Sequence, residues 1–324
     1  MNSKADMNVS VQRLNDLRGL MAIWIVLGHL ALSMDAQRNI FLMMQKADLA
    51  IVGMFFFLSG YGLEKSLETK KDYLRSFLFK KIARLLLMTW VQFGVTELCL
   101  YLVKFPRDYS GLTGILGEYA SNLNWYMWEL ALMYLIFFVS HILFKDKKAY
   151  IAATVLSVLM LITLYYFQGA FASTYSCLAF PAGMIVYACR HKFEKASGSR
   201  FGEMFIALLI LTGLTTASTI MPKDLFASVA CKNLFCVCFV ILAAVTFLRL
   251  EADDKPYRIL AKFSPEIYLY QFPAASVTMA IACRHHDRQR GLLYAAVTFV
   301  LTMVMAVIMY LVRRGFEKVI NNDN

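Results

Sequence analysis

The sequence predicts an all-α integral membrane protein, a bundle of about ten transmembrane helices with both termini in the cytoplasm. Hydrophobic residues make up 59% of the 324 residues and charged residues only 17%, whereas a soluble chain is about 45–50% apolar and about 25% charged. The apolar residues are gathered in blocks long enough to cross about 30 Å of hydrocarbon. Only helices suit such blocks, because a backbone in lipid has to satisfy its own hydrogen bonds.

Ten apolar blocks follow one another along the chain, and each predicts one helix. The first block follows a mildly polar N-terminus and has no small-residue cleavage pattern after it, so we expect a retained span rather than a removed signal peptide. The second and sixth blocks are short. The predicted spans are 17–34, 48–63, 82–103, 123–144, 149–167, 175–189, 203–220, 225–248, 263–283 and 291–312.

Lysine and arginine residues orient the predicted bundle. With a cytoplasmic N-terminus, the cytoplasmic segments hold 24 of the 33 Lys and Arg residues, as expected for loops that stay inside. The net charge of +11 is therefore spread over loops that face anionic lipid, which favours membrane lipids as partners and argues against nucleic acid. We expect the protein in the cell membrane as a multi-pass protein.

The blocks predict a single domain over residues 1–324, with the helical bundle at about 13–315 and no fused soluble domain. No linker, low-complexity tract or internal repeat interrupts them. The seven cysteines lie mostly inside apolar blocks without a Cys-x-x-Cys pair, which favours packing and no metal site. His285 and His286 are adjacent in an outer loop, without a clear third ligand set, and are predicted to be solvated.

The stretch "LNDLRGLMAIWIVLGHL" (14–30), which leads into the first block and overlaps most of it, carries Arg18 and His29. An Arg at the centre of a membrane helix costs roughly 2.5 kcal/mol or more to insert. Eleven residues turn a helix by about 20° beyond three full turns, so both side chains share one face about 16 Å apart. Arg18 suits phosphate recognition at the cytoplasmic edge, and His29 suits proton transfer. The alternatives are an ordinary basic helix end and a packing histidine.

Glu129, in "NWYMWELALMY" (124–134), lies at a depth similar to that of His29 in the outer half of the bilayer. A carboxylate beside the histidine would orient the ring and stabilise its protonated form. The sequence leaves open whether the first and fourth spans touch, and another helix or a water cavity would equally satisfy Glu129. Trp125, at the same end, is typical of the interfacial belt.

The second block ends in "VGMFFFLSGYG" (52–62), whose glycines permit close helix approach or an unwound turn. Ser59 can donate a hydrogen bond there. Seven basic residues follow between 65 and 84, which favour anionic lipid or a landing site for a polyanionic cytosolic cofactor. Lys81 and Arg84 are three apart and would be neighbours on a helix face.

These motifs, in this order, resemble the acyltransferase-3 family over essentially the whole chain. The "LRGL…GH" span with its Arg-x10-His spacing, the Gly-x-x-Phe-Phe-x-Leu-Ser-Gly stretch, the Trp-x-x-x-Glu segment and the late Ser-x-x-Ile-Tyr-Leu motif are all met. The matching residues are Arg18, Gly19, Gly28, His29, Gly53, Phe56, Phe57, Leu58, Ser59, Gly60, Trp125, Glu129, Ser264, Ile267, Tyr268 and Leu269.

The chain departs from the family pattern at three places. Asn15 and Asp16 stand where the family usually has Asp-Gly. Lys81 replaces the first Arg of an Arg-x-x-Arg pair, which keeps the charge and loses the bidentate fork. Gln271 occupies a position where His is common, so a second titratable group is not expected there.

The resemblance implies ten helices, acetyl-CoA or another acyl-CoA as donor on the cytoplasmic side, and a hydroxyl of an extracytoplasmic glycan or similar acceptor. It implies catalysis by His29 and Glu129, without a metal. It further suggests donor contacts from Arg18, Ser59, Lys81 and Arg84, and acceptor contacts from Trp125 and Tyr268. A proton-coupled carrier with a His29–Glu129 relay and a non-catalytic ligand-binding module remain alternatives, and a homo-oligomer is possible.

Overall fold

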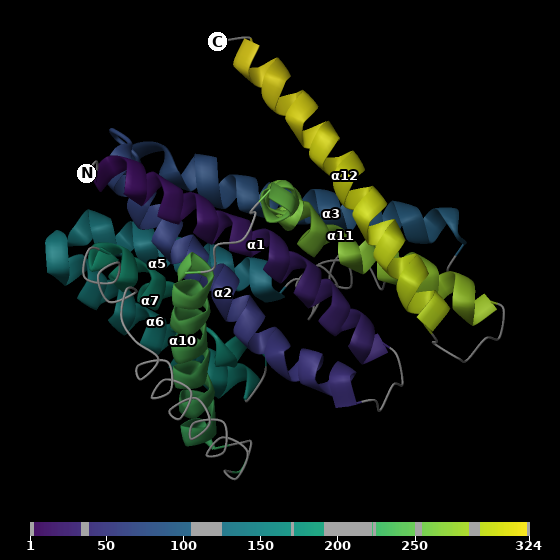
Figure 1. Ribbon diagram of the computed structural model, residues 1–324, viewed down its shortest axis with the longest axis horizontal. Helices are drawn as coiled ribbons and strands as arrows, with labels where there is room; N and C mark the ends of the chain where they lie inside the picture. Colours follow the sequence, from purple (N-terminus) through teal and green to yellow (C-terminus); the bar gives the residue numbers. More distant parts are fainter. Residues whose placement is uncertain are drawn as a thin grey trace. The chain divides into compact units, whose positions relative to one another are not determined.

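The computed structural model describes residues 3–33, 39–104, 125–169, 172–190, 222, 225–249, 255–284 and 292–322. These residues are helical almost throughout, with no strand among them, which confirms the all-α class. The helices, shown in Figure 1, are α1 (Ser3–Ser33), α2 (Asn39–Thr69), η1 (Leu74–Ser76), η2 (Leu78–Ala83), α3 (Arg84–Leu102), α5 (Trp125–Leu143), α6 (Asp146–Gln168), η3 (Ala172–Tyr175), α7 (Ala179–Ala188), α10 (Phe226–Arg249), α11 (Lys255–Arg284) and α12 (Leu292–Asn322).

Every predicted span within the described residues coincides with a helix, whereas the span predicted at 203–220 lies outside them. Several helices run well past the apolar blocks. The second block, 48–63, covers only the middle of the 31-residue α2, and α1 begins at Ser3, far before the first block. An apolar block shows only which part of a helix is hydrophobic. The helix itself continues through polar residues wherever its backbone hydrogen bonds and its neighbours support it.

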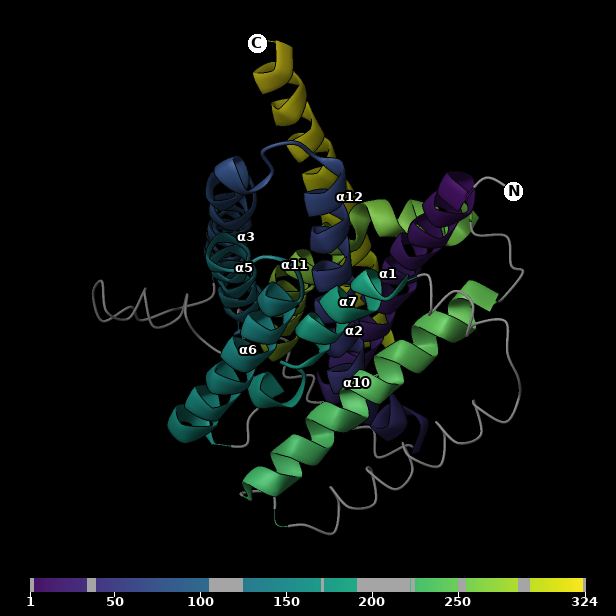
Figure 2. The same cartoon turned by 90° about the vertical axis from the view of Figure 1, so that its left-hand side faces the viewer.

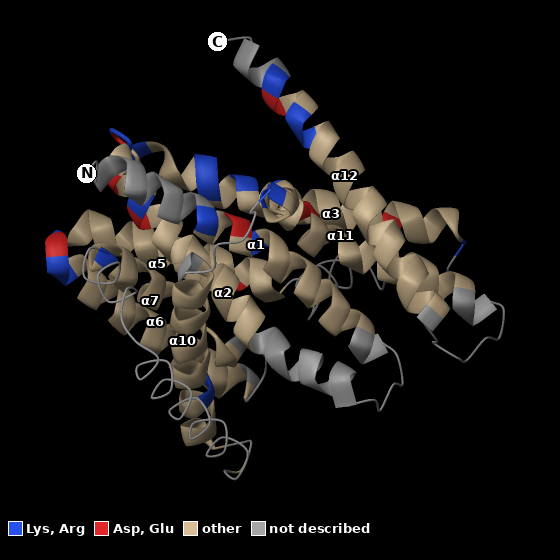
Figure 3. Ribbon diagram, viewed as in Figure 1, with Lys and Arg blue, Asp and Glu red and all other residues tan. Residues whose placement is uncertain are grey.

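Five described helices are long and apolar enough to cross a membrane: Leu78–Leu102, Trp125–Leu143, Asp146–Phe167, Phe226–Phe247 and Leu293–Lys318. In Figure 3, charge on α6 is confined to its first turn, and charge on α12 lies in its C-terminal part. Helices α1, α2 and α11, which carry most of the motif residues, are not among these five described spans. The count of ten spans and the cytoplasmic termini therefore stay predictions.

The chain divides into two compact units that interleave along the sequence. Unit 1 contains Met1–Leu17, Leu49–Leu86 and Trp125–Asp253, and unit 2 contains Arg18–Asp48, Leu87–Asn124 and Asp254–Asn324. Each unit gathers segments that are far apart in the sequence. The expectation of a single domain stays a prediction.

In unit 1, α5 packs on α6, α6 on α7, and α7 on α10 (Figure 2). Helices α2 and α7 approach so closely that glycine is required on both sides. A Cβ added at Gly60 would lie 2.2 Å from the carbonyl oxygen of Phe180, and one at Gly183 would lie 2.1 Å from that of Phe57. A Cβ at Gly62 would meet nothing within 4 Å. The glycines of the second block thus serve close approach at Gly60, and α2 continues through them without an unwound turn.

In unit 2, α11 packs against α12 and against α1. A Cβ added at Gly19 of α1 would lie 2.5 Å from the backbone nitrogen of Ala261, so the two helices touch backbone to backbone there. Helix α11 contains Pro265, which has no N–H for the helix hydrogen bond to Ala261. The Ser264 hydroxyl donates to that carbonyl oxygen at 3.0 Å, which explains why a serine precedes the proline.

An ion pair between a buried carboxylate and a partly exposed guanidinium joins α11 to α12. The guanidinium of Arg313 donates from Nε to Oε1 of the buried Glu266 at 2.5 Å, and the Phe263 and Tyr310 rings meet edge to face one turn away, with centroids 4.6 Å apart. A buried carboxylate needs such a partner to remain charged. This pairing holds α11, the helix with the late Ser-x-x-Ile-Tyr-Leu motif, against its neighbour.

Candidate functional site

Arg18 and His29 lie on one continuous helix, α1, eleven residues apart as the spacing predicts, and both are in unit 2. Both side chains are partly buried. Arg18 is not at the beginning of this helix, because α1 starts at Ser3. His29 lies near the other end, four residues before Ser33.

His29 meets α11 through its ring nitrogen Nδ1, which lies 2.9 Å from Oε1 of Gln271. Gln271 is only 4% exposed, and its Nε2 donates to the backbone carbonyl of Tyr268 at 2.9 Å. The His29 ring also lies against Phe272, with centroids 5.6 Å apart. Within unit 2, no described residue hydrogen-bonds to Nε2 of His29.

Tyr268 belongs to the same cluster as His29. Its buried ring meets the edge of Phe272 at a centroid distance of 6.1 Å, and Phe272 in turn contacts His29. The structure therefore brings together two predicted site residues, His29 and Tyr268, from helices that are more than two hundred residues apart. Gln271 and Phe272 complete the cluster. The sequence singled out Gln271 only as a departure from a family pattern, and its position three residues after Tyr268 was the available signal.

Glu129 is buried in unit 1, on the first turns of α5, where it interacts electrostatically with Cys177. Trp125 begins the same helix one turn earlier and meets Tyr126 edge to face, with ring centroids 6.3 Å apart. His29 belongs to the other unit, so its pairing with Glu129 stays a prediction.

Ser59, Lys81 and Arg84 also lie in unit 1. Ser59 is partly exposed on α2, beside the glycine crossing with α7. Lys81 lies in the π-helical turn η2, and Arg84, which is exposed, begins α3 directly after it, so the two basic residues share one run of helix as expected. Phe79 in the same turn is 81% exposed.

A family described as "Acyltransferase domain", the acyltransferase-3 family, matches residues 11–311, nearly the whole chain. The chain belongs to the acyltransferase-3 family. Comparison with curated proteins and with solved structures found no match. Together with the apolar helices, membership makes the protein a membrane acyltransferase.

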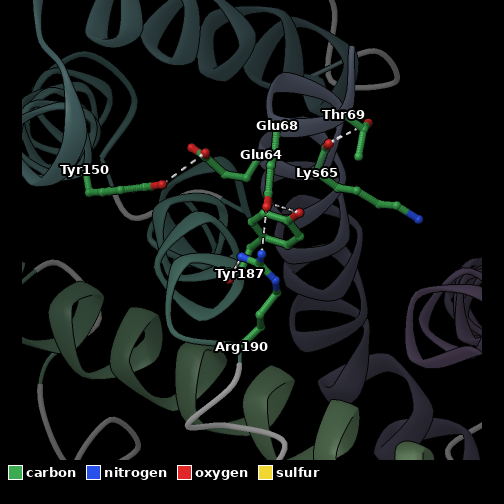
Figure 4. Close-up of polar contacts among 7 residues, drawn as sticks. All are labelled: Glu64, Lys65, Glu68, Thr69, Tyr150, Tyr187 and Arg190. Carbon is green, nitrogen blue, oxygen red and sulfur yellow. Dashed lines mark hydrogen bonds and ion pairs between the residues drawn. The ribbon is translucent and has the colours of Figure 1, made fainter. Parts of the chain in front are cut away.

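A second histidine of the acyltransferase lies in a polar cluster of unit 1 that the sequence did not reveal. His141 on α5 faces the buried Glu64 of α2, with Nε2 3.1 Å from Oε1. Its Nδ1 lies 3.0 Å from the carbonyl oxygen of Phe137, one turn earlier. The Tyr150 hydroxyl of α6 donates to Oε2 of Glu64 at 3.3 Å (Figure 4). By its place near the end of the fourth predicted span, His141 is expected to be an ordinary boundary residue.

One turn further along α2, Glu68 forms a similar contact with α7 (Figure 4). Arg190 donates from Nη2 to Oε1 of Glu68 at 2.8 Å, the Tyr187 hydroxyl donates to Oε2, and the guanidinium lies 4.4 Å from the centroid of the Tyr187 ring. Two acidic residues four apart, within an otherwise basic segment, were the sequence signal for this cluster. It ties α2 to α5, α6 and α7 of the acyltransferase.

The described residues contain no group of three or more His, Cys, Asp or Glu side chains placed to hold a metal ion. His285 and His286 lie outside the described residues.

Proposed function

We propose that this membrane acyltransferase moves an acetyl or other short acyl group from cytoplasmic acyl-CoA to a hydroxyl of an extracytoplasmic or membrane-linked acceptor, such as a cell-surface glycan, in the cell membrane. The observation that carries the proposal is the setting of His29. It is partly buried against α11, on the same helix as Arg18, and holds one ring nitrogen in a hydrogen bond while the other has no described partner in its unit.

Positive charge near Arg18 supports an anionic donor such as acyl-CoA. Gly19, the next residue, touches the backbone of α11 in its first turns. Those turns carry Lys255, Arg258 and Lys262, all exposed. Guanidinium and ammonium groups are the usual protein partners of phosphates. Ser59, Lys81 and Arg84 remain further candidates for donor contacts.

The distance between Arg18 and His29, about 16 Å along the helix, suits a donor whose phosphates bind at one end and whose thioester reaches the other. In the proposed step, His29 accepts the proton of the acceptor hydroxyl. The hydroxyl oxygen forms the new ester bond to the acyl carbon, the carbon–sulfur bond breaks, and the sulfur leaves and is protonated as the thiol. General base help of this kind contributes roughly 10²–10⁴-fold.

Tyr268 and Trp125 are the proposed acceptor contacts, and Glu129 is the proposed carboxylate partner in catalysis. Tyr268 has the stronger support, because its ring reaches His29 through Phe272. An aromatic ring beside the base offers a flat apolar surface and a hydroxyl, both of which suit a sugar.

The test uses membrane vesicles that contain the native protein, His29→Ala or Leu27→Ala. Leu27→Ala is the matched control, because it removes a side chain of similar exposure from the same helix. Acetyl-CoA labelled in the acetyl group is supplied, and label in glycan and lipid fractions is followed together with release of CoA. We expect transfer by the native protein and by Leu27→Ala, and none by His29→Ala. Absence of CoA release by the native protein with several acceptors would overturn the proposal in favour of a carrier or a binding module.

A further inference from the structure

The hydrogen-bond direction at Gln271 determines which nitrogen of His29 carries a proton. A glutamine amide has one end that donates and one that only accepts. At Gln271 the donor end is engaged, because Nε2 donates to the Tyr268 carbonyl at 2.9 Å. The acceptor end, Oε1, therefore faces Nδ1 of His29 at 2.9 Å. Since Oε1 cannot donate, Nδ1 is the nitrogen that carries the hydrogen.

A neutral imidazole carries one N–H, so a ring with its hydrogen on Nδ1 has a lone pair on Nε2. That lone pair is what a general base uses. In serine hydrolases a carboxylate holds the same tautomer, whereas here the partner is a neutral amide. An amide fixes the tautomer and orients the ring without adding a negative charge that favours the protonated form.

The surroundings of His29 keep this arrangement in place. Gln271 is buried, and Phe272 covers the ring from the next position of α11. Gln271 and Phe272, the described residues that form a hydrogen bond or a ring contact with His29, have no ionisable group. Among the described residues, Gln271 is therefore the hydrogen-bond partner that can select which nitrogen of the ring carries the hydrogen.

We propose that Gln271 is the positioning residue of the transfer reaction, holding His29 as the Nδ1–H tautomer with Nε2 directed to the acceptor hydroxyl. This inference rests on the proposed function in so far as it concerns catalysis. The tautomer itself does not depend on any activity.

Two substitutions separate the effects of the hydrogen bond from those of charge. Gln271→Met keeps the length of the side chain and removes both polar ends, so the ring is no longer fixed. We expect kcat to fall about 10–100-fold with an unchanged KM for acetyl-CoA, as when an interaction made only in the transition state is removed. Gln271→Glu keeps an acceptor at Nδ1 and adds a negative charge, which stabilises the protonated ring. Its activity should rise to a plateau at a pH about one unit or more higher than in the native protein.

Gln92→Met is the matched control, because Gln92 is a second buried glutamine of unit 2, and its side chain bonds Thr96 of its own helix. We expect its pH profile and kcat to match those of the native protein. A purely structural role for Gln271 predicts lower stability and yield in both Met variants, with an unchanged pH profile in Gln271→Glu. That result would overturn the proposal.

A second measurement separates this inference from the proposed function. Protein labelled with ¹⁵N histidine and held above neutral pH gives distinct nitrogen signals for protonated and unprotonated ring positions, and His29→Asn identifies the signals of residue 29. We expect a protonated Nδ1 and an unprotonated Nε2 in the native protein, and a mixture in Gln271→Met. A protonated Nε2 in the native protein would overturn the inference even if transfer is observed. The expected pattern without transfer would leave the tautomer intact and remove the proposed function.

Discussion

The two histidines described in the helices differ in how their ring nitrogens are used. In unit 1, both nitrogens of His141 face acceptors, a buried carboxylate of Glu64 and a backbone carbonyl. In unit 2, His29 has an amide at one nitrogen and no described partner in its unit at the other.

Residue type alone therefore does not distinguish a histidine that links two helices from one that is proposed to act as a base. His141 is saturated by its neighbours and therefore serves as a link between α5 and α2. His29 is oriented on one side only, and the remaining nitrogen can exchange a proton with a substrate. Both residues lie near the ends of apolar blocks, where the sequence gives them similar surroundings.

We expect the largest effect from substituting His29, the proposed base. His29→Asn removes the base and keeps a polar side chain that can still donate to Gln271. We expect transfer to fall by about 10²–10⁴-fold, with unfolding of the detergent-solubilised protein unchanged within about 1 kcal/mol. Initial rates of CoA release measure the loss of transfer, and unfolding in a denaturant series measures the stability. Full activity in this variant would remove His29 from the mechanism.

The next largest effect concerns His141 and is a loss of stability. His141→Leu leaves the buried Glu64 without its histidine partner, which costs about 3–5 kcal/mol of unfolding free energy in comparable buried pairs. The rate per folded molecule should stay close to native, because His141 is not the proposed base.

The double variant His141→Leu with Glu64→Leu sharpens this result. Replacing both members of a buried pair by apolar residues is often neutral, so we expect the double variant to regain most of the lost stability. The single variant Glu64→Leu completes the comparison. If the loss of unfolding free energy in the double variant equals the sum of the losses in the two single variants, the contact between His141 and Glu64 does not couple α5 to α2.

The smallest effect tests the helix that carries Glu64. Gly60→Ala places a methyl group against the Phe180 carbonyl of α7, and overpacking of this kind costs about 1–3 kcal/mol. Gly62→Ala, two residues further along the same helix, meets open space and should be neutral or stabilising by up to about 1 kcal/mol. Thermal unfolding of the two variants in the same detergent compares them. Equal stability would mean that α2 and α7 are not in tight contact.

The sequence predicted the features that depend on one helix. The placement of Arg18 and His29 on one helix follows from the apolar run and their spacing. Each apolar block that lies within the described residues contains a helix of the structure. Contacts between helices were beyond reach, because one sequence does not say which helices touch. Gln271 meets His29 across 242 residues of chain, and Glu64 meets His141 in the same way. Helix ends were also missed, because polar residues such as Glu64 and Glu68 continue α2 past its apolar block.

The contacts between α1 and α11 have a directional consequence. Gly19 touches Ala261 and His29 touches Gln271, so ten residues separate the contacts on both helices, and the numbering rises in the same direction. The two helices therefore run parallel. Arg18 and the basic residues in the first turns of α11 therefore lie on the same side of the His29–Gln271 contact along this helix pair, as the proposed path from a phosphate contact to the base requires.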